Sequence, residues 1–328
     1  MTSTFVRVVV AAAILAALSM RTAIPQATQK IHRLAILELG SADSNRARSE
    51  SFEQGLKKLG YVEGQNIVIE RRYADGQADR LPELAAELVR SKPDVIFAPT
   101  TPAALAAKGK SGSIPIVIAV ASEPVGSGFA ESLARPGGNV TGTSNIQTEI
   151  DAKRLQILKE VSPKIARVAL VHAGDRLSQF QVTAVQRGGR SLGIEIIAIE
   201  ARHAENFKSG FAAAKPRGVG AVLVASNAQN FLHKQLIIDL AAEHKLPAIC
   251  PNTGWIEYGC LMSYGTSSEA LYYRAAAYVG KIFKGAKPAE LPIEQPTKFE
   301  LEINLKTAKA LGLKIPRSII LRADKVIE

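Results

Sequence analysis

Short continuous apolar runs recur along the chain, and longer segments with helical spacing separate them. Examples of the runs are DVIFAPTT (94–101), IPIVIAV (114–120) and VALVH (168–172). Runs of this length are typical of strands covered on both faces, as in parallel sheets. The segments 81–90 and 204–214 have helical spacing. Strand–helix alternation of this kind predicts right-handed parallel βαβ units, and therefore an α/β fold.

The two halves of the chain repeat the same order of predicted elements. The pairs are Leu34–Glu38 with Val168–His172, Leu59-Gly60-Tyr61 with Leu192-Gly193-Ile194, 66–70 with 195–200, 81–90 with 204–214, 94–101 with 221–228, and 114–120 with 246–252. Corresponding points of these pairs lie between 127 and 134 residues apart, so both order and spacing repeat. An internal repeat of this kind predicts two similar doubly wound parallel-sheet lobes joined by a hinge.

The predicted crossings between the lobes define three parts of the chain. The strand 114–120 ends at Ser122-Glu123-Pro124, and Val140–Ser144 is expected to leave the first sheet as a connector. Cys260–Tyr264 is expected to form a strand that returns to the first lobe, followed by a helix over 268–283. Lys287–Pro296 carries three prolines and is expected to cross back. The expected domains are a signal peptide (1–29), lobe 1 (30–145 plus 256–286) and lobe 2 (146–255 plus 287–328).

The first 29 residues have the pattern of an export signal. Arg7 supplies the positive end, 8–18 is an apolar run too short to span a bilayer comfortably, and small residues follow. Cleavage is expected near Ala27, with Ser19 and Ala23 as alternatives and an uncleaved anchor as the competing interpretation. The sequence therefore predicts a secreted, periplasmic protein.

Composition and charge favour an ordinary globular protein and argue against a nucleic-acid partner. The chain is 47% hydrophobic and 22% charged, which is ordinary for a globular protein. Loss of Arg7 and Arg21 with the signal takes two positive charges off the formal +11 and leaves +9. The basic residues are scattered without a nucleic-acid motif, so we expect a solvated basic surface and no nucleic-acid partner.

Two cysteines and five histidines are present, and their spacing is not that of a metal site. An oxidising compartment would permit a bridge between Cys250 and Cys260. The predicted layout, however, places them on different lobes. Two buried free thiols are therefore the expectation.

Two motifs carry a family resemblance. SLARPGGNVTG (132–142) and the tail from Pro288 to Glu328 resemble the periplasmic substrate-binding proteins of ABC importers, in the family that includes tryptophan-binding lipoproteins. The resemblance extends from about Ile31 to Glu328. It implies a type I periplasmic binding fold, a small-molecule ligand, an ABC permease as partner, no cofactor and a monomer. It does not identify the ligand.

In open α/β sheets, ligands bind at the carboxyl ends of the strands, and this rule selects the candidate site residues. From the predicted first lobe they are Ser41, Thr100, Thr101, Ser122, Glu123 and Tyr264, and from the second His172, Asp175, Asn227 and Asn252. Thr101 is expected to cap a helix with Pro102 at its first position, which leaves amide N–H groups for an anionic group. A plain structural cap is the alternative for Thr101, as it is for Ser41.

The remaining candidates discriminate less between ligands. Glu123 could accept hydrogen bonds from a ligand or pair with an arginine. His172 could be structural, and Tyr264 could supply a stacking wall. Asn227 occupies the place where amino-acid-binding relatives tend to carry an Asp, which argues against a zwitterionic amino acid. Asn252 suits almost any polar ligand.

Three functions compete. A receptor that closes over a solute and delivers it to a permease agrees with the signal, the repeat and the resemblance. A sensory receptor that docks on a chemoreceptor or sensor kinase would use the same lobes. A periplasmic hydrolase would need a nucleophile motif, and the known ones are missing, although His172, Asp175 and Ser178 offer triad residue types. The sequence favours the receptor and leaves the ligand open.

Overall fold

The computed structural model describes residues 30–145 and 148–328. The predicted signal peptide, with its cleavage near Ala27, lies outside the described residues. Contacts divide the chain after Ile31, and everything below concerns His32–Glu328. Within the described residues, no helix is both long and apolar enough to cross a bilayer.

The first sheet has five parallel strands in the order β2-β1-β3-β4-β5. They are β1 (His32–Glu38), β2 (Ile67–Tyr73), β3 (Val95–Phe97), β4 (Ile116–Ser122) and β5 (Val140–Asn145). This is a doubly wound order, in which the chain reverses direction across the sheet between β1 and β3.

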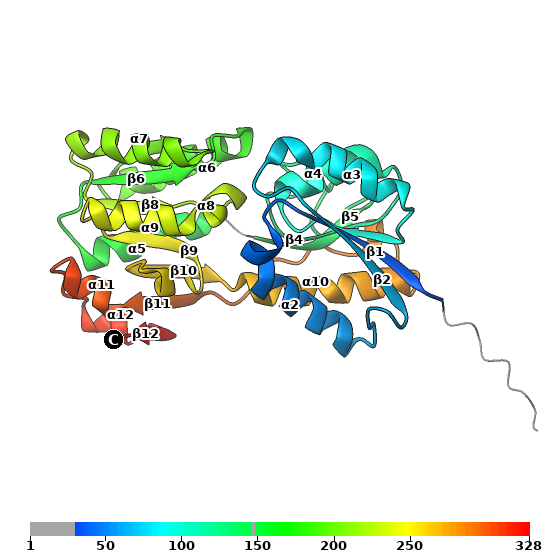
Figure 1. The fold of residues 1–328 in the computed structure, drawn as a ribbon. Coiled ribbons are helices and arrows are strands. Elements are labelled where there is room, and N and C mark those ends of the chain that lie inside the picture. The colour runs from blue at the N-terminus through cyan, green and yellow to red at the C-terminus, as the bar shows by residue number, and fades with distance from the viewer. Residues whose placement is uncertain (1–29, 146–147) are drawn as a thin grey trace, which may run out of the picture. The chain divides into compact units, whose positions relative to one another are not determined.

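Helices cover both faces of the first sheet. They are α2 (Ala42–Lys58), α3 (Leu81–Arg90), α4 (Thr101–Ser111) and α10 (Ser268–Phe283), with a short 3₁₀ turn at Ala78–Arg80. In β1, Ala35 and Leu37 face the core under α3 and α4, while Leu34 and Ile36 face α2 and α10. Figure 1 shows α3 and α4 above this sheet and α2 and α10 below it. The alternation along β1 is what a strand buried on both faces requires.

The second sheet has seven strands in the order β12-β11-β10-β9-β8-β6-β7. They are β6 (Arg167–His172), β7 (Glu195–Glu200), β8 (Ala221–Val224), β9 (Ala248–Asn252), β10 (Met262–Thr266), β11 (Glu300–Asn304) and β12 (Lys325–Ile327). The run β7-β6-β8-β9-β10 is parallel and repeats the order of the whole first sheet, while β11 is antiparallel to β10. The predicted pair of doubly wound lobes is therefore confirmed.

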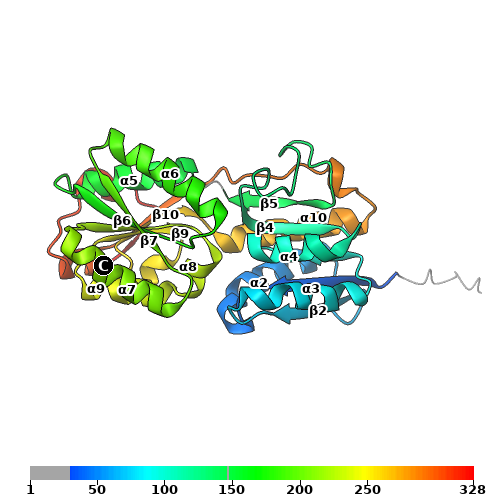
Figure 2. The ribbon, with the colours of Figure 1, turned by 90° about the horizontal axis from the view of Figure 1, so that it is seen from above.

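Helices also cover both faces of the second sheet, as Figure 2 shows. One face packs against α5 (Thr148–Val161), α6 (Arg176–Ser191), α11 (Leu305–Ala310) and α12 (Arg317–Ile320), and the other against α7 (Ala204–Ala214) and α9 (Lys234–Glu243). The shorter elements are α8 (Ala228–Leu232) and 3₁₀ turns at Lys215–Arg217, Trp255–Tyr258 and Pro288–Glu290. Here "lobe" means one sheet with its covering helices.

Two strand assignments from the sequence are wrong. Val140–Ser144 does not leave the first sheet, because β5 pairs with β4 and is buried throughout. Cys260–Tyr264 does not return to the first lobe, because β10 pairs with β9 in the second sheet. The two errors share one cause. Each repeat has a fifth strand, and the comparison of the halves stopped at the fourth.

The segment after α10 stays with the first lobe for longer than predicted. The amide of Ile293 donates to Leu133, its side chain is buried in the core under α3 and α4, and Thr143 and Glu294 form a β-bridge. The chain therefore returns to the second sheet between Glu294 and Glu300, which overlaps only the end of the crossing predicted at Lys287–Pro296.

The expectation of two free thiols is also wrong. Cys250 and Cys260 form a disulfide, with their Cα atoms 6.6 Å apart. Cys250 lies in β9, and the loop after β9 returns the chain to the start of β10. Because β10 runs parallel to β9, Cys260 arrives beside Cys250. Once β10 was assigned to the wrong lobe, the sequence could not predict this bond.

Removing the disulfide should destabilise the fold. The bond joins residues 10 positions apart, and closing a loop of this length removes about 2.7 kcal/mol of chain entropy from the unfolded state. We expect the double variant Cys250→Ala, Cys260→Ala to lose that amount in urea unfolding. A reductant should lower the free energy of unfolding of the wild type to that of the variant, and it should not change the value for the variant. Indifference of the wild type to reductant would contradict the bond.

Candidate ligand-binding site

A cavity of about 400 Å³ is lined by residues from both lobes. Its walls come mainly from segments that follow the carboxyl ends of strands, as the topology of doubly wound sheets leads one to expect. The lining residues are Arg48, Thr100, Thr101, Pro102, Val120, Ser122, Glu123, Gly126, Asn145, Ala173, Asp175, Ser178, Gln181, Ser226, Asn227, Ala228, Gln229, Phe231, Asn252 and Ser268. A volume of this size accommodates a small organic solute.

Most of the candidates from the sequence meet in this cavity. The seven that line it are Thr100, Thr101, Ser122, Glu123, Asp175, Asn227 and Asn252. Ser41, His172 and Tyr264 are not among the described lining residues. The strand-end rule therefore located the cavity, although it did not separate lining residues from their neighbours.

The three residues outside the cavity have structural roles. Ser41 caps α2, and its Oγ accepts from the amide of Ser44 at 3.2 Å. His172 is buried at the end of β6, its Nδ1 accepts from the amide of Gly174, and burial lowers its pKa. Tyr264 lies in β10, where its ring stacks on Phe299.

The predicted cap of α4 is one residue off. The helix begins at Thr101, so Thr100 is the N-cap and Pro102 is the second helical residue. Thr101 Oγ1 accepts from the amide of Ser122 at 2.9 Å and thereby ties the start of α4 to the end of β4. Thr100 makes no side-chain cap, and its Oγ1, which is buried beside the cavity, has no hydrogen-bond partner among the described residues.

Asp175 and Asn227 cap helices of the second lobe. Asp175 Oδ1 accepts from both the amide and the hydroxyl of Ser178 at the start of α6. Asn227 Oδ1 accepts from the amide of Asn230 at 2.8 Å at the start of α8. In both residues the cap uses Oδ1. The second polar atom of each side chain, Oδ2 of Asp175 and Nδ2 of Asn227, is therefore the one left for a ligand.

Glu123 adopts a left-handed backbone with φ of 46°. This conformation is uncommon for a residue other than glycine, asparagine or aspartate. The turn that it opens is closed by the amide of Ser127, which donates to the Glu123 carbonyl at 2.8 Å. The strain lies at the exposed rim of the cavity, where such conformations tend to be retained for function.

Arg48 is the main lining residue that the sequence analysis missed. It lies on α2, is 6% exposed, and its guanidinium lies 3.8 Å from the ring centroid of Phe231 on the other lobe. A sequence signal was available, because Arg48 shares a helix face with Phe52 and Leu56, four and eight residues later. Because α2 is mostly polar, this buried helix face was not recognised from the sequence.

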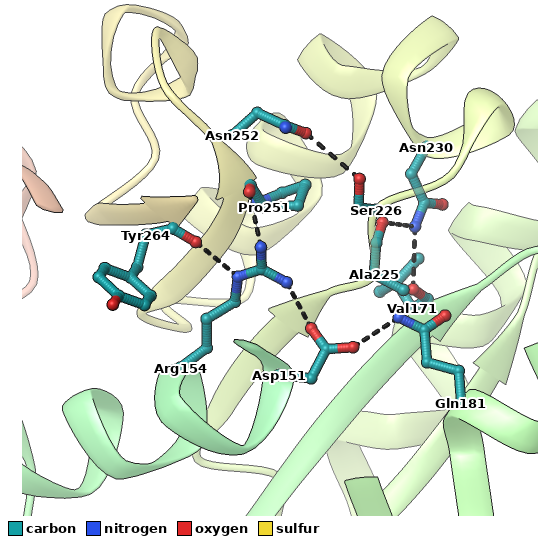
Figure 3. A network of polar contacts seen from close by, with 10 residues as sticks. All are labelled: Asp151, Arg154, Val171, Gln181, Ala225, Ser226, Asn230, Pro251, Asn252 and Tyr264. Carbon is teal, nitrogen blue, oxygen red and sulfur yellow. Dashed lines mark hydrogen bonds and ion pairs between the residues drawn. The ribbon is translucent and has the colours of Figure 1, made fainter. Parts of the chain in front are cut away.

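A buried polar network supports the cavity wall from behind (Figure 3). The amide of Gln181, which lines the cavity, donates to Asp151, and Asp151 pairs with Arg154 at 2.5 Å. Arg154 also donates to the carbonyls of Pro251 in β9 and Tyr264 in β10. The network therefore joins α5 and α6 to β9, which carries Asn252, and to β10. Burial raises the pKa of Asp151, which the guanidinium opposes.

Glu38 is buried at the end of β1, beside a small hollow that it shares with Arg48 and Thr100. Burial raises its pKa to about 7, although the Arg48 charge and a hydrogen bond from the hydroxyl of Tyr272 oppose the shift. In residues 30–145 and 148–328, no cluster of His, Cys, Asp and Glu suits a metal ion. The cavity is thus built from hydroxyls, amides, one buried arginine, the exposed carboxylates of Glu123 and Asp175, and apolar walls.

Comparisons with known proteins agree with this geometry. Residues 33–327 match the family model described as ABC transporter substrate binding protein. A tyrosine-binding protein of Clostridioides difficile is 26% identical over 288 residues, which are 88% of this chain and 83% of that protein.

Two solved structures share the fold. A conserved domain protein of Vibrio cholerae is 24% identical, with a TM-score of 0.85, over 90% of this chain and 100% of that one. A domain from Streptococcus pneumoniae, solved in complex with L-Trp, is 22% identical, with a TM-score of 0.84, over 90% of this chain and 99% of that one. With the family model matching nearly the whole described chain, this protein belongs to the ABC transporter substrate-binding proteins.

Proposed function

We propose that this protein is the solute receptor of an ABC importer. It captures a small polar or carboxylate-bearing organic solute in the cavity between its lobes and delivers that solute to a membrane permease. The observation that carries the proposal is the 400 Å³ cavity, whose walls come from both lobes of a family member. A tyrosine-binding relative and an L-Trp-bound structure support a solute of amino-acid size.

The proposed mechanism is closure of the two lobes about their connections. Residues 32–145 with 268–294 would move as one body, and 148–266 with 300–327 as the other. Contact between Arg48 and Phe231 links the lobes directly. A solute that touches both walls binds the closed form more tightly and so shifts the population towards it. Small-angle scattering should therefore record a smaller radius of gyration when solute is added.

The proposed location and partners follow from the family. Substrate-binding proteins of ABC importers are extracytoplasmic. We propose that residues 1–29 direct export and are removed near Ala27, and that the mature chain acts as a monomer. The disulfide supports export, because such bonds persist in oxidising compartments.

Ligand binding should raise the melting temperature of the protein. A solute at a hundred times its dissociation constant adds about 2.7 kcal/mol, which corresponds to a shift of a few degrees. Melting curves against amino acids, carboxylates, amides and polyols should identify one active class.

A cavity-filling variant provides the control. Ser226→Trp places a large side chain in the cavity and should abolish the shift. Ser209→Trp, on the exposed surface of α7, should preserve it. If no solute class raises the melting temperature and no solute copurifies with the protein, the receptor proposal fails.

A further inference from the structure

The polar atoms in the cavity wall that lack partners are unevenly distributed between donors and acceptors. Within the described residues, three buried polar atoms of the lining have no hydrogen-bond partner: Arg48 Nε, Thr100 Oγ1 and Asn227 Nδ2. Arginine and the amide NH₂ only donate, and the hydroxyl does either. An unpaired buried polar group is costly, so a ligand that supplies acceptors to these atoms is favoured.

Arg48 provides a buried positive charge at one end of the cavity. Its Nη2 donates to Asn45 Oδ1, its Nε is unpaired, and no carboxylate in the described chain forms an ion pair with it. The nearby carboxyl of Glu38 is held partly protonated at neutral pH by its raised pKa, which leaves the arginine under-compensated. A buried cation without an anion is unfavourable. A ligand anion beside Arg48 would supply the missing charge.

Thr100 belongs to the same end of the cavity. It is 6% exposed, and with Arg48 it also lines the small hollow beside Glu38. It caps the N-terminus of α4, a helix of 11 residues, without using its own hydroxyl for the cap. The helix dipole and the free hydroxyl both favour an oxyanion here.

The wall on the second lobe offers a donor where an ammonium group would need an acceptor. Asn227 Oδ1 accepts the hydrogen bond that caps α8, and Nδ2 of this lining residue has no partner among the described residues. Nearby, Asn252 Oδ1 accepts from the hydroxyl of Ser226, and Asn252 Nδ2 donates to the carbonyl of Thr266. The Oδ1 atoms of Asn227 and Asn252 therefore already accept hydrogen bonds within the protein.

Two carboxylates also line the cavity, and both are exposed. Asp175 Oδ1 receives two hydrogen bonds from Ser178, and Glu123 also has a partner. Apolar walls from Val120, Ala173 and Phe231 lie among the polar groups. The buried part of the cavity thus combines one positive charge, unused donors and apolar surface.

We propose, resting on the receptor function above, that the ligand is an organic acid without an ammonium group. Its carboxylate binds Arg48 and Thr100, and a second oxygen acceptor, such as a hydroxyl or carbonyl, binds Asn227. This proposal excludes a zwitterionic amino acid as the preferred solute.

The test compares each amino acid with the acid that lacks its ammonium group. Calorimetric titration of the purified protein would use L-tyrosine against desaminotyrosine, and L-leucine against its 2-oxo acid. At least one acid should bind about tenfold or more tightly than its amino acid, because the ammonium group would face an unpaired donor. An amino acid that binds as tightly as its acid, or more tightly, would overturn the proposal.

Three variants test the residues. Asn227→Asp keeps a good helix cap and adds an acceptor, so the preference should move by about tenfold towards the amino acid. An unchanged ratio contradicts the role of Asn227. Arg48→Gln should abolish binding of both carboxylates, whereas Arg48→Lys should retain part of it. Equal affinities of the Gln and Lys variants would contradict the role of Arg48.

If none of the four probes binds, mass spectrometry of solute released by denaturation decides. A copurified acid without an amine supports the proposal. A copurified amine or neutral solute overturns it while leaving the receptor function standing. Absence of both binding and copurified solute overturns the proposal and the receptor function together.

Discussion

Replacing Arg154 with methionine should lower the free energy of unfolding by about 3–5 kcal/mol. The substitution leaves the Asp151 carboxylate, which is fully buried, without the guanidinium that neutralises it. It also leaves the carbonyls of Pro251 and Tyr264 without their donor. Urea unfolding measures the loss. Since Asp151 can then be buried cheaply only when protonated, the loss should be larger at pH 8 than at pH 5.

Two controls separate burial from charge. Arg167 forms an exposed ion pair with Glu195, so Arg167→Met should lower the free energy of unfolding by less than about 1 kcal/mol. The double variant Asp151→Leu, Arg154→Met removes both buried charges and should regain part of the loss. A loss below about 1 kcal/mol in Arg154→Met would show that the hydrogen bonds of Arg154 to β9 and β10 do not hold α5 in place.

Replacing Glu38 with glutamine should stabilise the protein by up to about 3 kcal/mol above pH 8. The wild-type pKa is raised from 4.5 to about 7 in the folded state. Between these values the folded state retains a proton that the unfolded state releases, so wild-type stability falls as the pH rises through this window. Glutamine stays neutral and can still accept from the hydroxyl of Tyr272, so the variant avoids the loss.

Unfolding curves at pH 4.5, 6 and 8.5 would measure this difference. The gain should be near zero at the lowest value and largest at the highest. Glu83→Gln, on the exposed face of α3, controls for the change in net charge. A gain that does not vary with pH would contradict a raised pKa at Glu38.

The sequence predicted the repeated units well because their signal is local. The helices at 81–90 and 204–214 and the strand at 195–200 have the bounds that the pattern indicated. Which sheet a strand joins is not a local property, since the five residues of β10 are compatible with a strand in either sheet. The misplacement of β10 then hid the disulfide, because a pairing of Cys250 with Cys260 requires both to lie in one lobe.

The sequence predicted backbone positions of the site but not the side-chain geometry, which also depends on distant parts of the chain. The strand-end rule gave backbone positions, and seven of its candidates line the cavity. It could not supply Arg48, which comes from the side of a helix. Nor could it show that the cap of α8 uses Asn227 Oδ1 whereas the cap of α4 does not use the Thr100 hydroxyl. That choice depends on side-chain geometry, and it decides the chemistry that remains for a ligand.

The late position of α10 in the chain has a consequence for biogenesis. Tyr272, Tyr278 and Val279 complete the core that Phe52 and Phe97 begin, yet they are synthesised after the first five strands of the second sheet. A chain that emerges N-terminus first therefore cannot close its first lobe until more than four-fifths of its length has been made. Until then the ring surfaces of Phe52 and Phe97 remain available to a chaperone. Slow completion of this kind would suit the export proposed above, because a chain that folds late stays unfolded for longer after synthesis.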